Sequence, residues 1–355
     1  MLKKKLVAAD VVIGAGSMLA AVPALATTGN GTASWQVVKE FHGGVQTGPS
    51  AMTGVPGGGA WAFVGSNGPQ AFERTGSGWT QMPFPAGYYQ VDLAAASSPT
   101  NVWAFTEYFT SGGLQTQYRA LRWNGHSWSV RGSFGLQVAA ASVLAPNDVW
   151  VFGQVDGQPG NGLGAFHYNG SSRTRVADAS DEGGAALADD DVWVGHQTAI
   201  GHWNGQSWQR TSVAALLPRG AELDGILAES SDNVYAVGLK GPAETFVLHY
   251  DGQSWTRVFT GAFGSGQETI QQPMTADGHG GFWLIGSVYG NSLIGGLLVH
   301  YSDGRVTTST APALPGQGTQ LNTIMQVAGT GQMLAGGYSS NPKTPRTGII
   351  VQYGG

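Results

Sequence analysis

Acidic and amide side chains recur in this sequence at one place in a repeating pattern, just ahead of short runs of small residues. The carboxylates among them include Asp92, Glu182 and Asp224. Two carboxyl groups about 5–9.5 Å apart, one of them with a raised pKa, can cleave a glycosidic bond. One hypothesis is therefore a glycan hydrolase or lyase that pairs Asp92 with Glu182, or Glu182 with Asp224.

The same segments carry the side chains expected for binding a sugar or a polar peptide without catalysis. Amides and carboxylates form hydrogen bonds, while tyrosine rings offer faces for stacking. The candidate ligand-binding residues are Tyr88, Tyr89, Gln90, Tyr108, Gln137, Asp181, Glu182, Glu222, Gln271, Tyr289, Asn322 and Tyr338. The sequence contains no Gly-x-Ser-x-Gly, His-Glu-x-x-His or phosphate-loop motif, so we expect binding as the function and hydrolysis as the alternative.

Metal ligands are sought among histidines and acidic runs. Four of the eight histidines share one position in four different repeats, so their side chains diverge and do not converge on one ion. They are His167, His202, His249 and His300. The acidic run that holds Asp178, Asp181 and Glu182 offers oxygens to calcium, but it lacks the spacing of an EF-hand loop. We expect no bound metal and no cofactor, with calcium on that run as the alternative.

The elements that position these residues follow from a repeated hairpin pattern: an aromatic residue, Asn-Gly or Asp-Gly, a polar residue, Ser and Trp. The clearest copies are 123–128, 203–208 and 250–255, and weaker copies are 74–79, 168–173 and 301–306. Asn-Gly and Asp-Gly favour positive φ, so each copy predicts two antiparallel strands joined by a type I′ turn.

A seventh copy is divided between the two ends of the chain. The aromatic residue and the turn stand at 353–355, and the returning Ser-Trp stands at 34–35. A linear array of repeats has no use for such a division, whereas a closed ring pairs its N-terminal strand with its C-terminal repeat and removes both sheet edges. The sequence therefore predicts a ring.

A second pattern precedes each hairpin, typified by Asn101-Val102-Trp103-Ala104-Phe105, and it recurs about every 45 residues. Short runs of Ala, Gly and Ser come before it, as at 93–97 and 138–142. This spacing is typical of propeller blades of four strands, and only small residues fit where the innermost strands approach the axis. We predict an all-β, seven-bladed β-propeller over residues 27–355, with its tryptophans packed between blades.

Loop lengths indicate which face of this propeller binds a ligand. The turns between the first and second strands of each blade, such as 189–191, are short and alike. The loops at the other end of the blades, for example 83–90 and 107–118, vary in length and composition. Variable loops on a rigid scaffold commonly carry binding sites, so the candidate residues above are expected around the mouth of the central channel on that face.

The first 26 residues read as a secretory signal peptide, with Lys3, Lys4 and Lys5, an apolar run and the cleavage site Ala24-Leu25-Ala26. Asp10 interrupts the apolar run, so a retained membrane anchor is the alternative. After cleavage we expect a secreted, extracellular monomer without a membrane span, whose partner is an extracellular glycan or a cell-surface protein. The chain has no cysteine and a net charge of −5, which argues against a disulfide framework and against nucleic-acid binding.

The Asp/Asn-Val-Trp-Ala segment followed by His-Trp-Asn-Gly-x-Ser-Trp resembles the secreted β-propeller repeats of actinobacterial and other bacterial proteins, which are kelch-like and galactose-oxidase-like in architecture only. The resemblance implies the fold and export. It implies no copper radical chemistry, because the cysteine that cross-links the galactose-oxidase tyrosine is missing. The Gly-Gly doublet that ends the second strand of a kelch repeat is matched at that position only by Gly336-Gly337, and Asp251 lies one residue too close to Trp255 for a sialidase Asp-box.

Overall fold

The computed structural model describes a chain built almost wholly of β-strands. The described residues are 34–42, 48–65, 68–109, 116–134, 136–155, 164–177, 183–241, 244–262, 268–289 and 294–354. The predicted signal peptide, 1–26, and the acidic run 178–182 lie outside them. Within the described residues the one helical segment is the 3-10 turn η1 (Ala214–Leu216), and no helix is long and apolar enough to cross a membrane.

The strands form seven antiparallel sheets of four strands each, which confirms the predicted seven-bladed β-propeller. From the innermost strand outward, blade 1 is β2 (Pro49–Val55), β3 (Gly59–Val64), β4 (Gln70–Thr75), β5 (Gly78–Met82); blade 2 is β6 (Gln90–Ser98), β7 (Asn101–Phe109), β8 (Thr116–Trp123), β9 (Trp128–Phe134). Blade 3 is β10 (Leu136–Ala145), β11 (Asp148–Val155), β12 (Gly164–Tyr168), β13 (Arg173–Ala177); blade 4 is β14 (Gly184–Ala188), β15 (Asp191–His196), β16 (Ala199–Trp203), β17 (Trp208–Ser212). Blade 5 is β18 (Glu222–Ser230), β19 (Asn233–Lys240), β20 (Glu244–Tyr250), β21 (Trp255–Ala262); blade 6 is β22 (Glu268–Ala276), β23 (Phe282–Tyr289), β24 (Ile294–Ser302), β25 (Arg305–Thr310). Blade 7 is β26 (Gly318–Gln326), β27 (Met333–Asn341), β28 (Thr344–Tyr353) and, from the other end of the chain, β1 (Gln36–Phe41).

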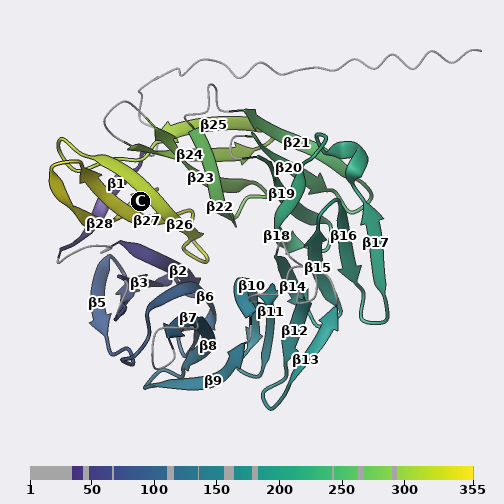
Figure 1. Ribbon diagram of the computed structural model, residues 1–355, viewed down its shortest axis with the longest axis horizontal. Helices are drawn as coiled ribbons and strands as arrows, with labels where there is room; N and C mark the ends of the chain where they lie inside the picture. The colour runs from purple at the N-terminus through teal and green to yellow at the C-terminus, as the bar shows by residue number, and fades with distance from the viewer. Residues whose placement is uncertain are drawn as a thin grey trace, which may run out of the picture. The chain divides into compact units, whose positions relative to one another are not determined.

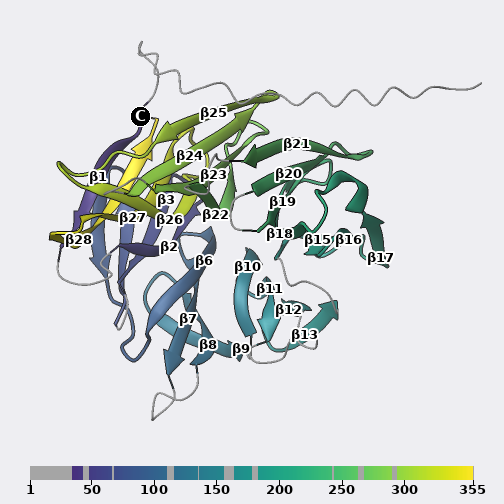
Figure 2. The ribbon, with the colours of Figure 1, turned by 45° about the horizontal axis from the view of Figure 1, so that its top comes forward.

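The seven innermost strands contact one another in sequence around the axis, and β26 returns to contact β2 (Figures 1 and 2). At some points their approach is close enough to exclude a side chain. A Cβ atom on Gly54 of β2 would lie 2.4 Å from the carbonyl oxygen of Gln326 on β26. The predicted runs of small residues, including 94–96 on β6, therefore lie where the blades converge.

Blade 7 joins the two ends of the chain, as the divided hairpin copy predicts. β1 pairs antiparallel with β28, with Gln36 opposite Gln352. Trp35 meets the ring of Trp283 edge-on at 5.4 Å, in the neighbouring blade 6, and lies 5.5 Å from Tyr353. Strand β1 thus completes the last sheet and covers the edge that β28 would otherwise expose.

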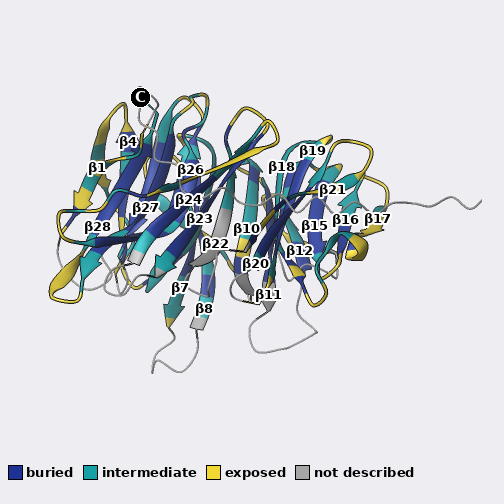
Figure 3. Cartoon of the chain, turned by 90° about the horizontal axis from the view of Figure 1, so that it is seen from above, coloured by how far each residue is buried: buried dark blue, intermediate teal, exposed yellow. Residues whose placement is uncertain are grey.

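Among the described residues the core forms seven hydrophobic clusters, each of which combines side chains from two neighbouring blades. One cluster joins Trp61 and Phe63 of blade 1 to Val91 and Trp123 of blade 2. The buried residues lie mainly on the middle strands, such as β23 and β27, while turns and outer strands are more exposed (Figure 3). The prediction that tryptophans pack between blades is confirmed for those on the second strands, which are Trp61, Trp103, Trp150, Trp193 and Trp283.

The type I′ turn prediction is wrong for the clearest hairpin copies. Trp123 pairs with Trp128, so the loop holds four residues, and of these only Gly125 has a positive φ. Asn124 uses its side chain instead, because its Oδ1 accepts hydrogen bonds of 2.9 Å from the backbone N–H groups of the second and third residues after it. Both residues of Asp303-Gly304 do have positive φ, at 51° and 73°, in a two-residue loop.

Deleting residues 27–41 should unfold the ring far more readily than trimming an ordinary terminus. The deletion removes Trp35 and the buried Phe41, which packs 4.9 Å from Phe72, and loss of one such buried aromatic ring costs roughly 3–5 kcal/mol. Thermal unfolding followed by circular dichroism measures the effect. A variant lacking only 27–33 keeps β1 and serves as the control, and an unchanged melting temperature after the longer deletion would contradict the role given to β1.

Candidate binding site at the central channel

The innermost strands bulge near their first residues, and this irregularity directs side chains to the channel. The register shifts by one residue between Val91 and Leu93 in β6 and between Leu321 and Thr323 in β26. Similar shifts occur in β2, β10, β18 and β22. A bulged residue leaves the regular alternation of the strand and can be re-aimed. The bulged residues Ser50, Asp92, Ala139 and Asn322 all line the central cavity.

That cavity has a volume of about 610 Å³ and a lining of mostly small side chains. Its described lining comes from β2, β6, β10, β22 and β26, and it includes the alanines 94–96. Ser50, Asp92 and Asn322 supply polar groups, and Asp92 is the one carboxylate in this lining. A cavity of this size, with Ser, Thr, Asp, Asn and Gln side chains among its lining, can admit part of a small polar ligand.

Two of the bulged side chains donate hydrogen bonds to the backbone of the next blade. Asn322 Nδ2 donates to the carbonyl of Pro49 at 3.2 Å, and Ser50 Oγ donates to the carbonyl of Val91 at 2.7 Å. Asp92 holds the third place in this series, but an ionised carboxylate has no proton to donate. Its Oδ2 is buried and has no hydrogen-bond partner among the described residues.

Burial raises the pKa of Asp92 to about 7, which makes this carboxyl unusual. The Gln90 side chain donates a 2.5 Å hydrogen bond to Asp92 Oδ1 and lowers the pKa, but not enough to offset burial. The negative charge of Glu107 raises it further. Asp92 is therefore partly protonated near neutral pH, and its protonated form can donate a hydrogen bond as Ser50 and Asn322 do.

An aromatic patch, defined here as Tyr89, Tyr108, Phe109 and Arg119, lies where β6 begins and β7 ends. The rings of Tyr89 and Phe109 are 4.9 Å apart, and Phe109 is 46% exposed. The guanidinium of Arg119 lies 3.9 Å from the centre of the Tyr108 ring, a cation–π contact. Tyr88 packs beneath the patch and is only 8% exposed, so its ring supports the site and has little surface for a ligand.

Blade 7 repeats part of this arrangement. The hydroxyl of Tyr338 donates a 2.5 Å hydrogen bond to Gln320 Oε1, and Arg346 lies 4.3 Å from the centre of the Tyr338 ring. The same pairing of tyrosine and arginine therefore occurs on two blades whose bulged residues, Asp92 and Asn322, share the cavity.

Apart from the four tyrosines described above, the predicted site residues divide into three groups. Gln90 and Asp92 are in contact, and Asn322 lines the same cavity. Glu222 is exposed at the start of β18, and Asp224 is the bulged residue of that strand but does not belong to the described cavity lining. The third group lies outside what the structure describes. Asp178, Asp181 and Glu182 are outside the described residues, and the side chains of Gln137, Gln271 and Tyr289 are outside the description as well.

Sequence reasoning missed three contributors to this site: Ser50, Glu107 and Arg119. Ser50 resembles any other small residue of an innermost strand, and Arg119 approaches Tyr108 only because β7 and β8 pair in this register. Both carboxylate pairs proposed for hydrolysis include Glu182, which lies outside the described residues. Asp92 has the raised pKa that such chemistry needs in its acid.

At the opposite end of the blades, each of the four histidines pairs with an Asp or Asn of its own blade, and the four side chains do not converge on one point, as predicted. His167 faces Asp148, His202 faces Asp191, His249 faces Asn233 and His300 faces Asp277, with distances from Nε2 to oxygen of 2.9, 2.9, 2.8 and 2.8 Å. Each imidazole also stacks on the aromatic ring of its second strand, with centroids 3.8–4.6 Å apart. These pairs tie the second strand of a blade to the third. The run 189–191 holds the predicted short turn.

Comparison with known proteins supports the fold and leaves the chemistry open. No protein-family model and no curated protein sequence matches the chain. The solved structure of YCF48 bound to D1 peptide is similar with a TM-score of 0.57 at 11% identity, covering 94% of this chain and 99% of that chain. The WD40 β-propeller domain of Doa1 matches with a TM-score of 0.56 at 10% identity (90% and 97% covered), and Sqt1 of Saccharomyces cerevisiae with 0.52 at 11% (88% and 86%).

Replacing Asp92 by Asn should stabilise the protein at alkaline pH. The folded-state pKa of about 7 exceeds the ordinary 3.8, so the natural protein loses stability as pH rises from about 4 to 7. Since each pKa unit is worth about 1.4 kcal/mol, D92N should gain roughly 2–4 kcal/mol at pH 8.5 and little at pH 4. Urea unfolding at the two pH values checks this. Asn already holds the equivalent position in β26, and a D92N gain that is independent of pH would refute the assignment.

Proposed function

We propose that this protein is a secreted, non-catalytic binding propeller that recognises a glycan at the face carrying the aromatic patch. The observation that carries the proposal is the exposed Phe109 ring beside Tyr89, next to a cavity whose polar groups include Asp92. Sugars present apolar C–H faces together with hydroxyls, so a ring that stacks beside groups that form hydrogen bonds suits them. Export rests on the predicted signal peptide.

The polar atoms support a sugar ligand in particular. Asp92 Oδ2 is a buried oxygen without a partner among the described residues, and a hydroxyl donor would satisfy it. Arg119 has N–H groups at the edge of its stack on Tyr108. The patch and the neighbouring Asp92 together combine a stacking surface with both a donor and an acceptor, which is the minimum for fixing the orientation of one sugar ring.

A peptide is the other ligand class considered for this face, because the similar structure of YCF48 holds one. An extended peptide would gain most by adding to an unpaired strand edge. The patch offers side chains at strand ends, whereas the unpaired edges belong to the outermost strands, such as β9 in blade 2 and β1 in blade 7. Glycan recognition is therefore the proposal, and peptide binding is an outcome that the experiment distinguishes.

The experiment is a glycan array probed with the purified protein, followed by calorimetric titration of the best glycan. We expect saturable binding to one polysaccharide class. Replacing Tyr89 and Phe109 together by Ala should weaken it at least tenfold, or about 1.4 kcal/mol. V130A is the matched control, because Val130 is 52% exposed on β9 and is not part of the patch.

Three results would count against the proposal. A blank glycan array together with binding on a peptide array would reassign the face to a protein partner. Equal loss in V130A and in the double variant would show that stacking at the patch is not responsible. Release of new reducing ends from the bound glycan would establish turnover, and D92N would then test whether Asp92 is the proton donor.

A further inference from the structure

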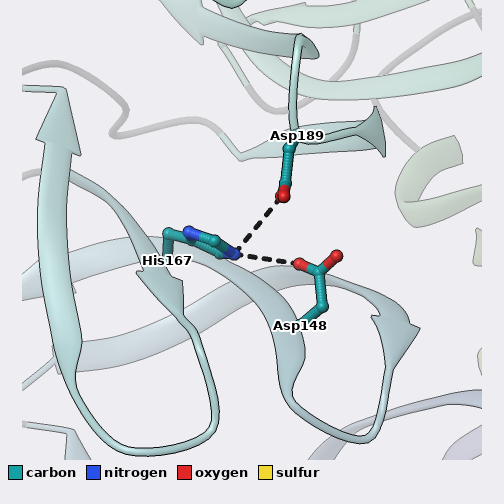
Figure 4. Close-up of side chains that lie close together, drawn as sticks. All are labelled: Asp148, His167 and Asp189. Atoms are coloured by element: carbon teal, nitrogen blue, oxygen red, sulfur yellow. Dashed lines mark hydrogen bonds and ion pairs between the residues drawn. The ribbon is translucent and has the colours of Figure 1, made fainter.

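Three side chains from two neighbouring blades meet at the end of the propeller opposite the aromatic patch. Asp148 begins β11, His167 lies on β12, and Asp189 lies in the turn between β14 and β15 (Figure 4). His167 Nε2 is 2.9 Å from Asp148 Oδ1 and 3.3 Å from Asp189 Oδ1. One atom from each side chain thus falls within 4.8 Å of the other two.

The equivalent pairs in other blades show what a purely structural contact looks like. In blade 6, Asp277 faces His300 and also accepts hydrogen bonds from the backbone N–H groups of His279 and Gly281. These donors outweigh burial and lower the pKa of Asp277. In blade 4, Asp191 faces His202 and also accepts from Trp193 and Ser231. Each of these carboxylates has a histidine and at least two further donors.

Blade 3 departs from this pattern, because it has a second carboxylate and fewer donors. Within the described part of the chain, the Asp148 carboxylate accepts only from His167. Asp189 shares that same imidazole nitrogen and accepts otherwise only a 3.3 Å hydrogen bond from Trp150 Nε1. A single ring N–H cannot donate fully to two carboxylates. Two negative charges therefore converge on one nitrogen, and the described residues offer them fewer donors than Asp277 and Asp191 receive.

We propose that Asp148, His167 and Asp189 bind a divalent transition-metal ion, with Zn²⁺ as the reference ion. Neutral imidazole and carboxylate are ordinary zinc ligands at about 2.0–2.2 Å, and such ligands in a tetrahedron lie about 3.4 Å apart, close to the 2.9 and 3.3 Å separations here. One nitrogen with two oxygens favours zinc over calcium, which prefers six or more oxygens.

The surroundings suit an open site. The Asp189 side chain is 63% exposed, so solvent can reach the ion and a water molecule can complete its coordination. The ring of His167 is held by stacking on Trp150, with centroids 4.6 Å apart and planes 15° from parallel. Its orientation is therefore fixed before the ion arrives, which lowers the entropic cost of binding.

Such an ion would connect two blades. Asp148 and His167 belong to blade 3, and Asp189 belongs to the turn of blade 4. Because the ligands come from different sheets, the ion would resist separation of these blades and stabilise the folded ring by mass action. This role is independent of glycan recognition at the other end of the blades.

The test is calorimetric titration of metal-free full-length protein with ZnCl₂, together with thermal unfolding with and without zinc. We expect one site with a dissociation constant in the micromolar range and a melting temperature that rises with zinc. D189N should weaken binding at least tenfold and abolish the thermal shift. H167Q should do the same, and Gln is the residue that blade 7 carries at this position.

D190N is the matched control. Asp190 is the exposed neighbour of Asp189 in the same turn and is not part of the cluster, so its replacement removes an equal charge and should leave zinc binding unchanged. Equal weakening in D190N and D189N would show nonspecific attraction and overturn the proposal. Absence of saturable binding to the natural protein below 1 mM zinc would overturn it as well.

Discussion

The close approach of seven innermost strands around one axis is the constraint on which the rest of this structure depends. A side chain at Gly54 would collide with the backbone of the adjacent blade, so small residues are needed there. The bulges have a role under the same crowding, because a bulge turns a side chain out of the regular alternation of the strand and directs it into the channel. Polar groups such as Ser50 and Asp92 enter the centre of the molecule by this route.

The outer parts of the blades follow a second constraint, which is that each sheet must be attached to the next without disulfides. Aromatic rings from the second strands fill the spaces between sheets. Histidines of the third strands stack on these rings, and each histidine also forms a hydrogen bond to an Asp or Asn near the start of the second strand, as His202 does with Asp191. The contacts extend across blades where Ser231 donates to Asp191 and where Tyr235 donates to Gly280. Conspicuous histidines and tryptophans are thus mostly structural, and chemistry has to be sought where a blade breaks the pattern.

The fold could be predicted from the sequence because the residue patterns that specify it repeat at a regular spacing. One strand pattern recurs seven times, and the divided copy at 353–355 and 34–35 requires closure, which the pairing of β1 with β28 supplies. The turn type was harder to predict, because Asn-Gly can form two kinds of loop. In one, both residues adopt a positive φ, and in the other the Asn side-chain oxygen accepts hydrogen bonds from backbone N–H groups. At Asn124 the second kind occurs, because the four-residue loop has two backbone N–H groups that need acceptors and the Asn124 side chain supplies one for both.

The site was less predictable because it depends on burial and on register between distant residues. Tyr88 and Tyr89 are neighbours in sequence, yet Tyr88 packs below the surface and Tyr89 meets the exposed Phe109. In the sequence, Asp189 is one residue of a predicted turn. Only the packing of neighbouring blades in the propeller brings it next to His167 of the preceding blade.

Two carboxylates depart from the repeat. Asp92 stands where blades 1, 3 and 7 have an uncharged side chain, and Asp189 adds a second carboxylate to a histidine pair that has one carboxylate or none in blades 4, 5 and 6. Asp92 stands where other blades have Ser50 and Asn322, which donate to the next blade and complete the inner ring. An ionised Asp92 cannot make that contact, so a buried oxygen remains without a partner among the described residues. A proton would satisfy it from within the protein, and a ligand hydroxyl would satisfy it from the channel. These two events compete for one atom, so a ligand hydroxyl that donates to it must displace the proton that burial favours.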